Sequence, residues 1–259
     1  MIIKNKKEFK KYKAICDLSV QILGEIKAIV KEGITPQEID EYATKLCEKH
    51  NVQPAFKGVT VGNAPEYECT TCIYLNDTVV HGVPNTEKIQ PEDIVKVDFG
   101  IKKDGYYTDH CFTVGIKPLL DKDKTFITES RNAILQGVNQ AIVGNTIGEI
   151  GQAIEAHANK FSYSVVKEFV GHGIGKSLHD YPDIPGYGGR GQGEKLKKGL
   201  VICIEAQIVD GIPDVFTCED SWTVKTKTGA KSCMFEYIVM VDNKKPRILT
   251  NTLDWELFV

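Results

Sequence analysis

The chain has 259 residues, 42% of them hydrophobic, and a formal net charge of −3. This length and apolar content allow a full core in one large domain or two fused halves, and the balanced charge gives no reason to expect nucleic acid or an acidic membrane as the main partner. No apolar run reaches the roughly 18 residues of a membrane span. No secretion signal follows the first methionine, so we expect a cytoplasmic protein.

Lysines are concentrated within residues 4–13. A solvated helix face explains them, and contact with an anionic surface such as ribosomal RNA is the alternative. The eight cysteines are scattered along the chain, and those in apolar patterns are expected to be reduced core residues. Cys69-Thr-Thr-Cys72 has no second pair at zinc-site spacing, so it gives little support for a structural zinc.

Two helices are expected at the start of the chain. Residues 6–31 carry apolar side chains at helical spacing. The second helix begins at Thr35, where Glu38 completes a capping box and Pro36 takes its preferred first position. A loop over 52–68 follows, and then come short strands near 70–75 and 78–81.

The stretch 94–115 is expected to form a β-hairpin. Runs rich in β-branched and aromatic residues flank Asp104-Gly105, a strong signal for a tight turn. Such a turn places Asp98 and Asp109 opposite or diagonal to each other, with both side chains on one face. Two close carboxylates repel one another, which indicates either a divalent cation between them or an exposed edge with solvated acids. The hairpin alone does not separate these interpretations.

The pattern of the first helix pair recurs weakly later in the chain. Residues 128–143 are expected to be helical, and Thr146 with Glu149 opens another capping box. This pattern indicates two related halves, about 6–120 and 121–245, within a single domain over 1–259, although a chance match is the alternative. No linker-like or low-complexity segment separates the halves.

Two further carboxylates lie in strongly apolar runs, Glu205 in an expected strand over 200–208 and Glu236 in one over 234–241. Another strand is expected at 221–225. Strands this apolar are usually buried on both faces, where an isolated carboxylate neutralises or destabilises the fold. Neither run contains lysine or arginine. A metal site shared with the hairpin acids is therefore favoured over independent salt bridges.

One histidine joins these acids. His172 lies between glycines, where the backbone can approach a ligand closely. Four carboxylates and one imidazole suit a pair of divalent cations, whose charge they nearly cancel. Such a pair lowers the pKa of a shared water and polarises a substrate carbonyl. The oxygen-rich donor set favours manganese, iron(II) or cobalt, with zinc as the alternative.

The other histidines divide by context. His81 ends an expected strand and His179 follows the glycine-rich segment, so both are candidates to contact a reacting amide. His110 follows Asp109 directly, and strand alternation sends it to the opposite face. His50 and His157 lie on expected helices and are assigned to the surface or core.

Together these residues closely resemble the type I methionine aminopeptidases, which have the pita-bread fold, an α/β (α+β) arrangement of two pseudo-symmetric halves around a metal-binding cleft. The resemblance covers nearly the whole chain. It rests on these matches: Asn76-Asp77 with His81-Gly-x-Pro84, Asp98 with Asp109, Gly171-His-Gly-Ile-Gly with His179, Glu205, Trp222 and Glu236.

The resemblance implies a two-metal site. Asp98 would bind one metal, and His172 and Glu205 would hold the other. Asp109 and Glu236 would bridge both metals. A hydroxide between the metals would attack the substrate.

The resemblance also implies a substrate site. His81 and His179 correspond to substrate-contacting histidines and, with Glu205, make up the catalytic set. Cys72 and Trp222 correspond to positions at or near the substrate pocket. The implied reaction removes the initiator methionine from nascent chains whose second residue is small. We expect a monomer, with the ribosome surface as a further contact.

Some features depart from the family pattern. Residues 56–68 look lengthened where relatives place aromatic residues of the methionine pocket, and Ala206 stands where proline is usual. Two rivals stay open. Proline-specific aminopeptidases or dipeptidases usually carry a large N-terminal domain, whereas here the chain starts with the catalytic one. Non-catalytic peptide-binding modules of this fold typically lose metal ligands, and all five are present here.

Overall fold

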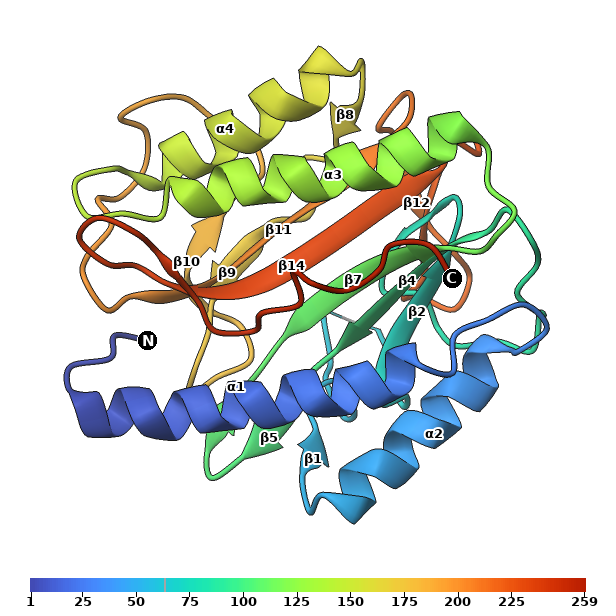
Figure 1. Cartoon of the computed structure of the whole chain (residues 1–259), viewed down its shortest axis with the longest axis horizontal. Helices are drawn as coiled ribbons and strands as arrows, with labels where there is room; N and C mark the ends of the chain where they lie inside the picture. The colour runs from blue at the N-terminus through green and yellow to red at the C-terminus, as the bar shows by residue number, and fades with distance from the viewer. Residues whose placement is uncertain (63) are drawn as a thin grey trace.

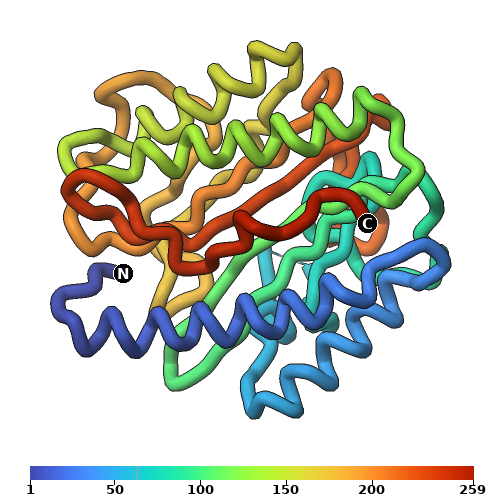
Figure 2. The backbone as a smooth tube through the Cα atoms, in the orientation of Figure 1, coloured from blue at the N-terminus to red at the C-terminus, as the bar shows by residue number. Residues whose placement is uncertain are grey.

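The computed structural model describes residues 1–62 and 64–259 (Figures 1 and 2). Asn63 lies outside the described residues. It belongs to the segment 56–68, which departs from the family pattern. The helices are α1 (Lys6–Lys27), α2 (Pro36–Lys49), α3 (Asp121–Asn139) and α4 (Ile147–Lys160). The strands are β1 (Gln53–Pro54), β2 (Thr71–Leu75), β3 (Thr78–Val80), β4 (Ile94–Phe99), β5 (Ile101–Lys103), β6 (Tyr106–Tyr107), β7 (His110–Gly115), β8 (Ser164–Val165), β9 (Gly171–Gly173), β10 (Asp180–Ile184), β11 (Val201–Val209), β12 (Val215–Thr217), β13 (Val224–Thr226), β14 (Ser232–Met240) and β15 (Arg247–Ile248).

The strands form one large sheet and three small ones. The large sheet has the order β10-β9-β11-β14-β15, with β8 also paired to β11. The small sheets have the orders β2-β4-β7, β12-β13-β3 and β1-β5-β6. In Figure 1, α3 and α4 cross the upper part of the molecule and α1 and α2 the lower part, with the central strands between them.

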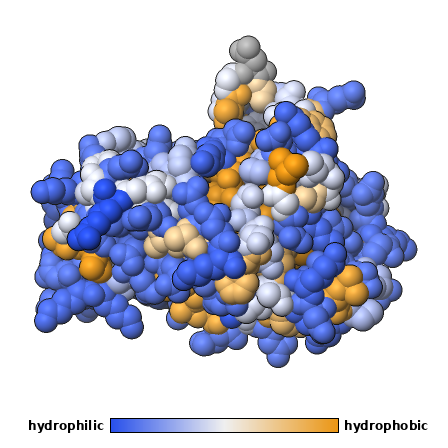
Figure 3. All heavy atoms as spheres, turned by 90° about the horizontal axis from the view of Figure 1, so that it is seen from above, coloured by the Kyte–Doolittle hydropathy of each residue, from blue (hydrophilic) through white to orange (hydrophobic). Residues whose placement is uncertain are grey.

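Each helix pair packs on its own apolar cluster. The first cluster joins α1 and α2 to the β2-β4-β7 sheet, and the second joins α3 and α4 to β11 and β14. On the face in Figure 3, most side chains are hydrophilic and the apolar ones lie in separate places. Among the described residues, no helix is both long and apolar enough to cross a bilayer.

Local sequence signals set the helix starts as predicted. The Thr35 hydroxyl accepts from the Glu38 N–H (3.1 Å), and the Glu38 carboxylate accepts from the Thr35 N–H (2.8 Å). Thr146 and Glu149 form the same capping box at α4. Each box satisfies two N–H groups that a helix start otherwise leaves unpaired.

Two predicted helices have different bounds in the structure. The predicted helix 6–31 ends at Lys27, because the N–H groups of Ile29 and Val30 bond to carbonyls three residues back and close a turn. The predicted helix 128–143 is α3, which begins at Asp121 and ends before Gln140. Its first turn carries two aspartates, which favour a helix start electrostatically.

The hairpin is confirmed. Lys103 pairs with Tyr106, so Asp104-Gly105 is a two-residue turn, and both residues have positive φ (51° and 76°) as a type I′ turn requires. The predicted strand at 221–225 was wrong in its first half. There the Asp220 carboxylate accepts the N–H groups of Trp222 and Thr223, so strand pairing begins at Val224.

The central sheets meet edge to edge where β7 runs beside β14 (Figure 1). The Thr113 hydroxyl donates to the Met234 carbonyl (2.5 Å) and accepts from the Met234 N–H (3.3 Å). Both residues are buried. A side chain therefore provides the connection between the two sheets. We call this contact the β7–β14 seam.

Replacing Thr113 by valine keeps its shape and removes the hydroxyl at the seam. We expect the free energy of unfolding to fall by about 1–3 kcal/mol, because the Met234 peptide groups lose a buried partner. Urea denaturation measures this. Thr125→Val is the matched control, because that hydroxyl bonds only within an exposed turn of α3, and its effect should stay within about 0.5 kcal/mol. Equal effects of the two substitutions would contradict the seam.

Candidate metal centre and substrate pocket

The hairpin brings its two aspartates to one face, as predicted. Asp98 pairs with Cys111 across β4 and β7, so Asp109, two residues earlier, lies diagonal to Asp98. Both aspartates are buried. Glycine is required at Gly100, because a Cβ there would lie 2.1 Å from the Thr108 carbonyl oxygen. The solvated-edge interpretation of the hairpin is therefore wrong.

The other two carboxylates face each other across the large sheet. Glu205 on β11 pairs directly with Glu236 on β14, within an unbroken antiparallel ladder. Both are buried, and the Gln207 amide donates to Glu205 Oε2 (2.7 Å). Adjacent like charges on paired strands destabilise a sheet unless something compensates them. The two sheets thus contribute two acids each.

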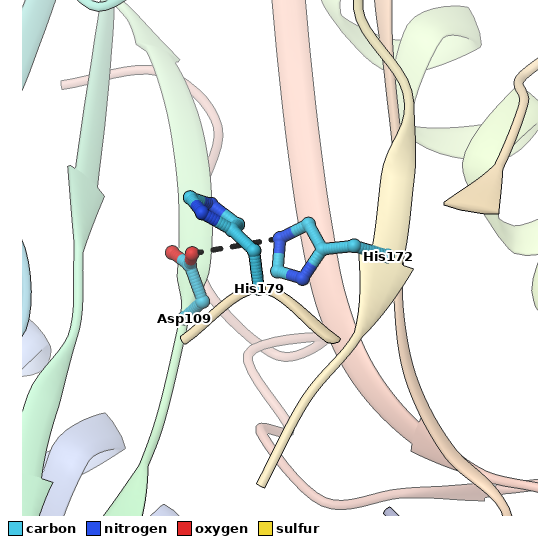
Figure 4. A group of neighbouring side chains, drawn as sticks. All are labelled: Asp109, His172 and His179. Carbon is cyan, nitrogen blue, oxygen red and sulfur yellow. Dashed lines mark ion pairs between the residues drawn. The ribbon is translucent and has the colours of Figure 1, made fainter. Parts of the chain in front are cut away.

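His172 on β9 completes the group. Its Nε2 lies 3.7 Å from Asp109 Oδ2, 3.8 Å from Glu205 Oε1 and 3.9 Å from Glu236 Oε1. Its Nδ1 lies 2.9 Å from the Gly173 carbonyl oxygen and donates to it. This bond fixes the tautomer and leaves the Nε2 lone pair facing the acids. Figure 4 shows His172 and His179 turned toward Asp109 from another segment of the chain.

The glycines that flank His172 allow its strand to pack closely against its neighbours. A Cβ at Gly171 would lie 2.4 Å from the Cys203 carbonyl oxygen, and one at Gly173 would lie 2.3 Å from the Tyr181 carbonyl oxygen. β9 therefore packs closely against its neighbouring strands at both glycines. This packing holds the His172 ring against the acids.

Burial shifts the pKa of every group in the site. It raises the pKa of Asp98 to about 6 and that of Glu205 to about 8. Burial, and then the neighbouring carboxylates, raise the pKa values of Asp109 and Glu236 well above the ordinary range. Burial lowers the pKa of His172 to about 3, so its ring is neutral at pH 7. Without a cation, this site holds protons that its acids would otherwise release.

The donor set fits divalent cations. Asp98 Oδ1, Asp109 Oδ1 and Glu236 Oε1 are buried without a hydrogen-bond partner. Ligand atoms of Asp98, Asp109 and Glu236 lie within 4.8 Å of one another, and so do those of His172, Cys203 and Glu236. Unpaired buried carboxylate oxygens are costly, and coordination of a metal satisfies them.

A small cavity of about 70 Å³ adjoins these acids. Its walls include all four residues assigned by resemblance to the substrate site: Cys72, His81, His179 and Trp222. The Trp222 indole donates to the Pro65 carbonyl (3.0 Å) and packs edge-on against Tyr67. The segment 56–68 is thereby tied to the cavity.

Several lining residues were not identified from the sequence. Phe56, Tyr67, Leu178 and Met234 all contribute to the cavity. Three of them lie outside the strands, where apolar periodicity gives no signal. Met234 lies two residues before Glu236 on β14, so strand alternation could have placed it on the same face.

Cys203 is buried in the core, as expected for a cysteine in an apolar strand, and it also lies next to the acids. It lies two residues before Glu205 on β11 and within ligand distance of His172 and Glu236. Burial raises the pKa of its thiol well above the usual range, so the thiol stays protonated. Cations that suit carboxylates prefer oxygen donors to sulfur, so Cys203 is not assigned as a ligand.

The two candidate substrate histidines have lowered pKa values. Burial and the neighbouring His179 ring lower the pKa of His81 to about 4, and burial lowers that of His179. His81 has φ 55°, a strained conformation that is common at functional sites. Ligand atoms of Asp109, His172 and His179 also lie within 4.8 Å of one another, so His179 has metal-ligand geometry too.

The remaining histidines lie away from the acids. His110 points to the opposite face, where its Nε2 lies 2.8 Å from the Ser19 hydroxyl on α1. His157 on α4 bonds to Glu129 (2.8 Å). His50 ends α2 and lies 3.4 Å from Glu25.

The buried acids predict how the stability of the metal-free protein depends on pH. Glu205 has a folded-state pKa of about 8, above its ordinary value of 4.5. Between about pH 6.5 and 8, the folded state therefore keeps protons that the unfolded state has released. The free energy of unfolding should fall as pH rises, by up to about 1.4 kcal/mol per pH unit for each such group. The histidines act below this window, because their folded-state pKa values are lowered.

Urea denaturation in the presence of a chelator, from pH 6.5 to 8, tests this. Glu205→Gln should reduce the slope and raise the stability at pH 8. Glu87→Gln is the control, because Glu87 is exposed. The same slope in wild type and Glu205→Gln would contradict the expectation.

Comparisons with known proteins identify the family. Residues 10–243 match the model of metallopeptidase family M24. Methionine aminopeptidase from Clostridium acetobutylicum is 33% identical over 251 residues, covering 96% of this chain and 98% of that protein. The crystal structure of methionine aminopeptidase from Thermotoga maritima has a TM-score of 0.90 at 30% identity, covering 97% of this chain and 100% of that one. Prolidase from Pyrococcus furiosus, with a TM-score of 0.76 at 22% identity over 97% of this chain and 66% of that one, shares the fold.

These findings confirm the predicted family and the pita-bread fold. A metallopeptidase implies bound divalent metal, in keeping with the donor set described above. The chain belongs to metallopeptidase family M24, among its methionine aminopeptidases.

Proposed function

We propose that this protein is a metal-dependent aminopeptidase that removes the N-terminal methionine from polypeptides. The observation that carries the proposal is the convergence of four buried acids and one neutral imidazole beside a small, largely apolar cavity. The near full-length similarity to methionine aminopeptidases supports the choice of methionine as the residue removed.

The grouping of the donors supports one assignment of roles. Asp109 and Glu236 form a group with Asp98, and each also belongs to a group with His172. We assign Asp109 and Glu236 to both metals and Asp98 to one of them. His172 and Glu205, whose ligand atoms lie 3.8 Å apart, would hold the other metal. The oxygen-rich set suits manganese, iron(II) or cobalt better than it suits zinc.

The side chains around the metals bind and orient the substrate. When bound, two divalent metals supply a water of lowered pKa and polarise the scissile carbonyl. His81 and His179 are neutral at pH 7 and can donate an N–H to the carbonyl oxygen or to the leaving nitrogen. We place Glu205 with them in the catalytic set, because it belongs to the metal donors and also lines the cavity.

The cavity supports a single apolar side chain as the group recognised. Phe56, Leu178 and Trp222 give it apolar walls, and Met234, two residues before Glu236 on β14, also lines it. We propose nascent chains with a small second residue as substrates. Action in the cytoplasm as a monomer, with the exposed lysines of α1 as a ribosome contact, stays a prediction.

Proline-specific peptidases are the second candidate, because a prolidase shares the fold. Met-Ala-Ser should be cleaved and Ala-Pro-Ser left intact, since the pocket accepts a methionine side chain. Release of the free amino acid, with Mn²⁺ or Co²⁺ present, measures both. Chelation should abolish cleavage, and added metal should restore it. Cleavage of Ala-Pro-Ser alone would move the chain to the proline-specific enzymes, and chelator-resistant cleavage would exclude a metal-dependent reaction.

The histidines can be separated from the metal donors. His81→Ala and His179→Ala should each lower kcat by roughly 10²–10⁴-fold, while the manganese bound per chain stays near wild type. His157→Ala on α4 is the control and should leave kcat unchanged, because its ring bonds to Glu129 on α3. Loss of metal in His179→Ala would make His179 a ligand instead.

A further inference from the structure

One buried lysine has no role in the reaction described above. Among the described residues, Lys96 is the only lysine or arginine whose side chain is fully buried. It lies on β4, two residues before Asp98, so both side chains project from the same face. Burying an unpaired ammonium is strongly unfavourable, so its surroundings must compensate the charge.

The Lys96 ammonium is surrounded by oxygen atoms of the peptide backbone and one hydroxyl. It donates to the Asn76 carbonyl (2.9 Å), the Ser232 carbonyl (3.0 Å) and the Ser232 hydroxyl (2.9 Å). The Ser232 hydroxyl donates in turn to the Thr78 carbonyl (2.7 Å), so it accepts from Lys96. Three acceptors require the three protons of the charged form. No carboxylate of the described chain lies within ion-pair distance of this ammonium.

This contact ties together strands that carry site residues. Asn76 follows β2, Thr78 begins β3 and Ser232 begins β14. β3 leads into His81, and β14 carries Glu236 on the same face as Ser232. β4, which holds Lys96, carries Asp98.

The lysine also crosses the seam between the sheets. Lys96 pairs with Thr113 across β4 and β7, and Thr113 contacts Met234 on β14. The ammonium therefore reaches past β7 to Ser232, which lies two residues before Met234. This contact fixes the position of β4 relative to β14. It lies on the same faces of these strands as Asp98 and Glu236, toward the start of each strand.

We propose that Lys96 is a positioning residue whose ammonium acts as an internal cation, holding Asp98, Glu236 and His81 at their places around the metal centre. The proposal rests on the metal-dependent function proposed above. Carbonyl dipoles from the Asn76 turn and from Ser232 converge on one point, and a cation there keeps them together. Without it, these dipoles repel, and the two sheets can shift along the seam.

The simpler alternative is that Lys96 acts only as an anchor, through the packing of its apolar side-chain stem. Replacing a buried charge by an apolar residue of similar volume is often neutral or stabilising. Such an anchor would affect folding stability but not metal affinity. The two explanations therefore differ in what a shape-conserving, uncharged substitution does to the metal site.

Lys96→Met removes the charge and keeps most of the length of the side chain. We expect weaker Mn²⁺ binding in a calorimetric titration and a kcat on Met-Ala-Ser lowered roughly 10- to 100-fold, with KM nearly unchanged. Lys231→Met is the matched control. Lys231 precedes Ser232 but bonds to the Glu92 carbonyl and the Asp123 carboxylate, away from the site. It should keep wild-type metal affinity and kcat.

Lys96→Ala allows rescue by an added amine. Asn76 and Thr78, whose carbonyl groups lie at this contact, also line a surface hollow of about 530 Å³, and we expect a small cation to enter the vacated space from there. Propylammonium should restore metal affinity and kcat at least several-fold in this variant, whereas sodium chloride at equal ionic strength should not. If Lys96→Ala does not fold, Lys96→Met and Lys96→Gln, which donates hydrogen bonds without charge, carry the test.

Two results would overturn the proposal. One is a folded Lys96→Met with wild-type metal affinity and kcat, and the other is a folded Lys96→Ala that no amine improves. The metal titration keeps this test separate from the proposed function. If the wild type cleaves no Met-Ala-Ser, the peptidase assignment fails, and the loss of Mn²⁺ affinity in Lys96→Met still decides the role of the lysine.

Discussion

Four buried carboxylates in one small space are the constraint on which the rest of this structure depends. Asp98, Asp109, Glu205 and Glu236 all lie where water is largely excluded, and no lysine or arginine of the described chain pairs with them. Two like charges about 4 Å apart cost on the order of 4 kcal/mol at the effective dielectric constant of a protein. The fold tolerates this cost only with protons or divalent cations in the site, so metal binding and stability are coupled.

The seam between the sheets makes this arrangement possible. Each sheet contributes two of the acids, and β7 and β14 bring the pairs together side by side. Thr113 joins the sheets next to the acids, and Lys96 reaches across the same seam one layer below them. Regular strands hold side chains more precisely than loops do, which suits a site that brings five donor side chains together. Prolidase from Pyrococcus furiosus shares this arrangement of the fold.

The cavity beside the acids is built in part from less regular segments of the chain. The cavity wall is completed by Phe56 and Tyr67 from the segment 56–68, and the Trp222 indole fixes that segment through Pro65. Asp220 holds Trp222 in a tight turn ahead of β13. Ala206, which stands where relatives usually have proline, lies in an unbroken ladder and leaves Glu205 paired with Glu236. The segment 56–68 thus contributes to the wall of the cavity, and Ala206 leaves the pairing of Glu205 with Glu236 in place.

The sequence by itself determined the features that depend on near neighbours along the chain. Capping boxes at Thr35 and Thr146, the Asp104-Gly105 turn and the acids in apolar strands all follow from local geometry and the two-residue period of a strand. The family motifs also predicted which residues far apart in the sequence lie together in the site. Tertiary structure alone decided the seam, the oxygen cage around Lys96 and the loop residues of the pocket. These features depend on contacts between segments far apart in the sequence. The periodicity of residues within one helix or strand carries no information about such contacts.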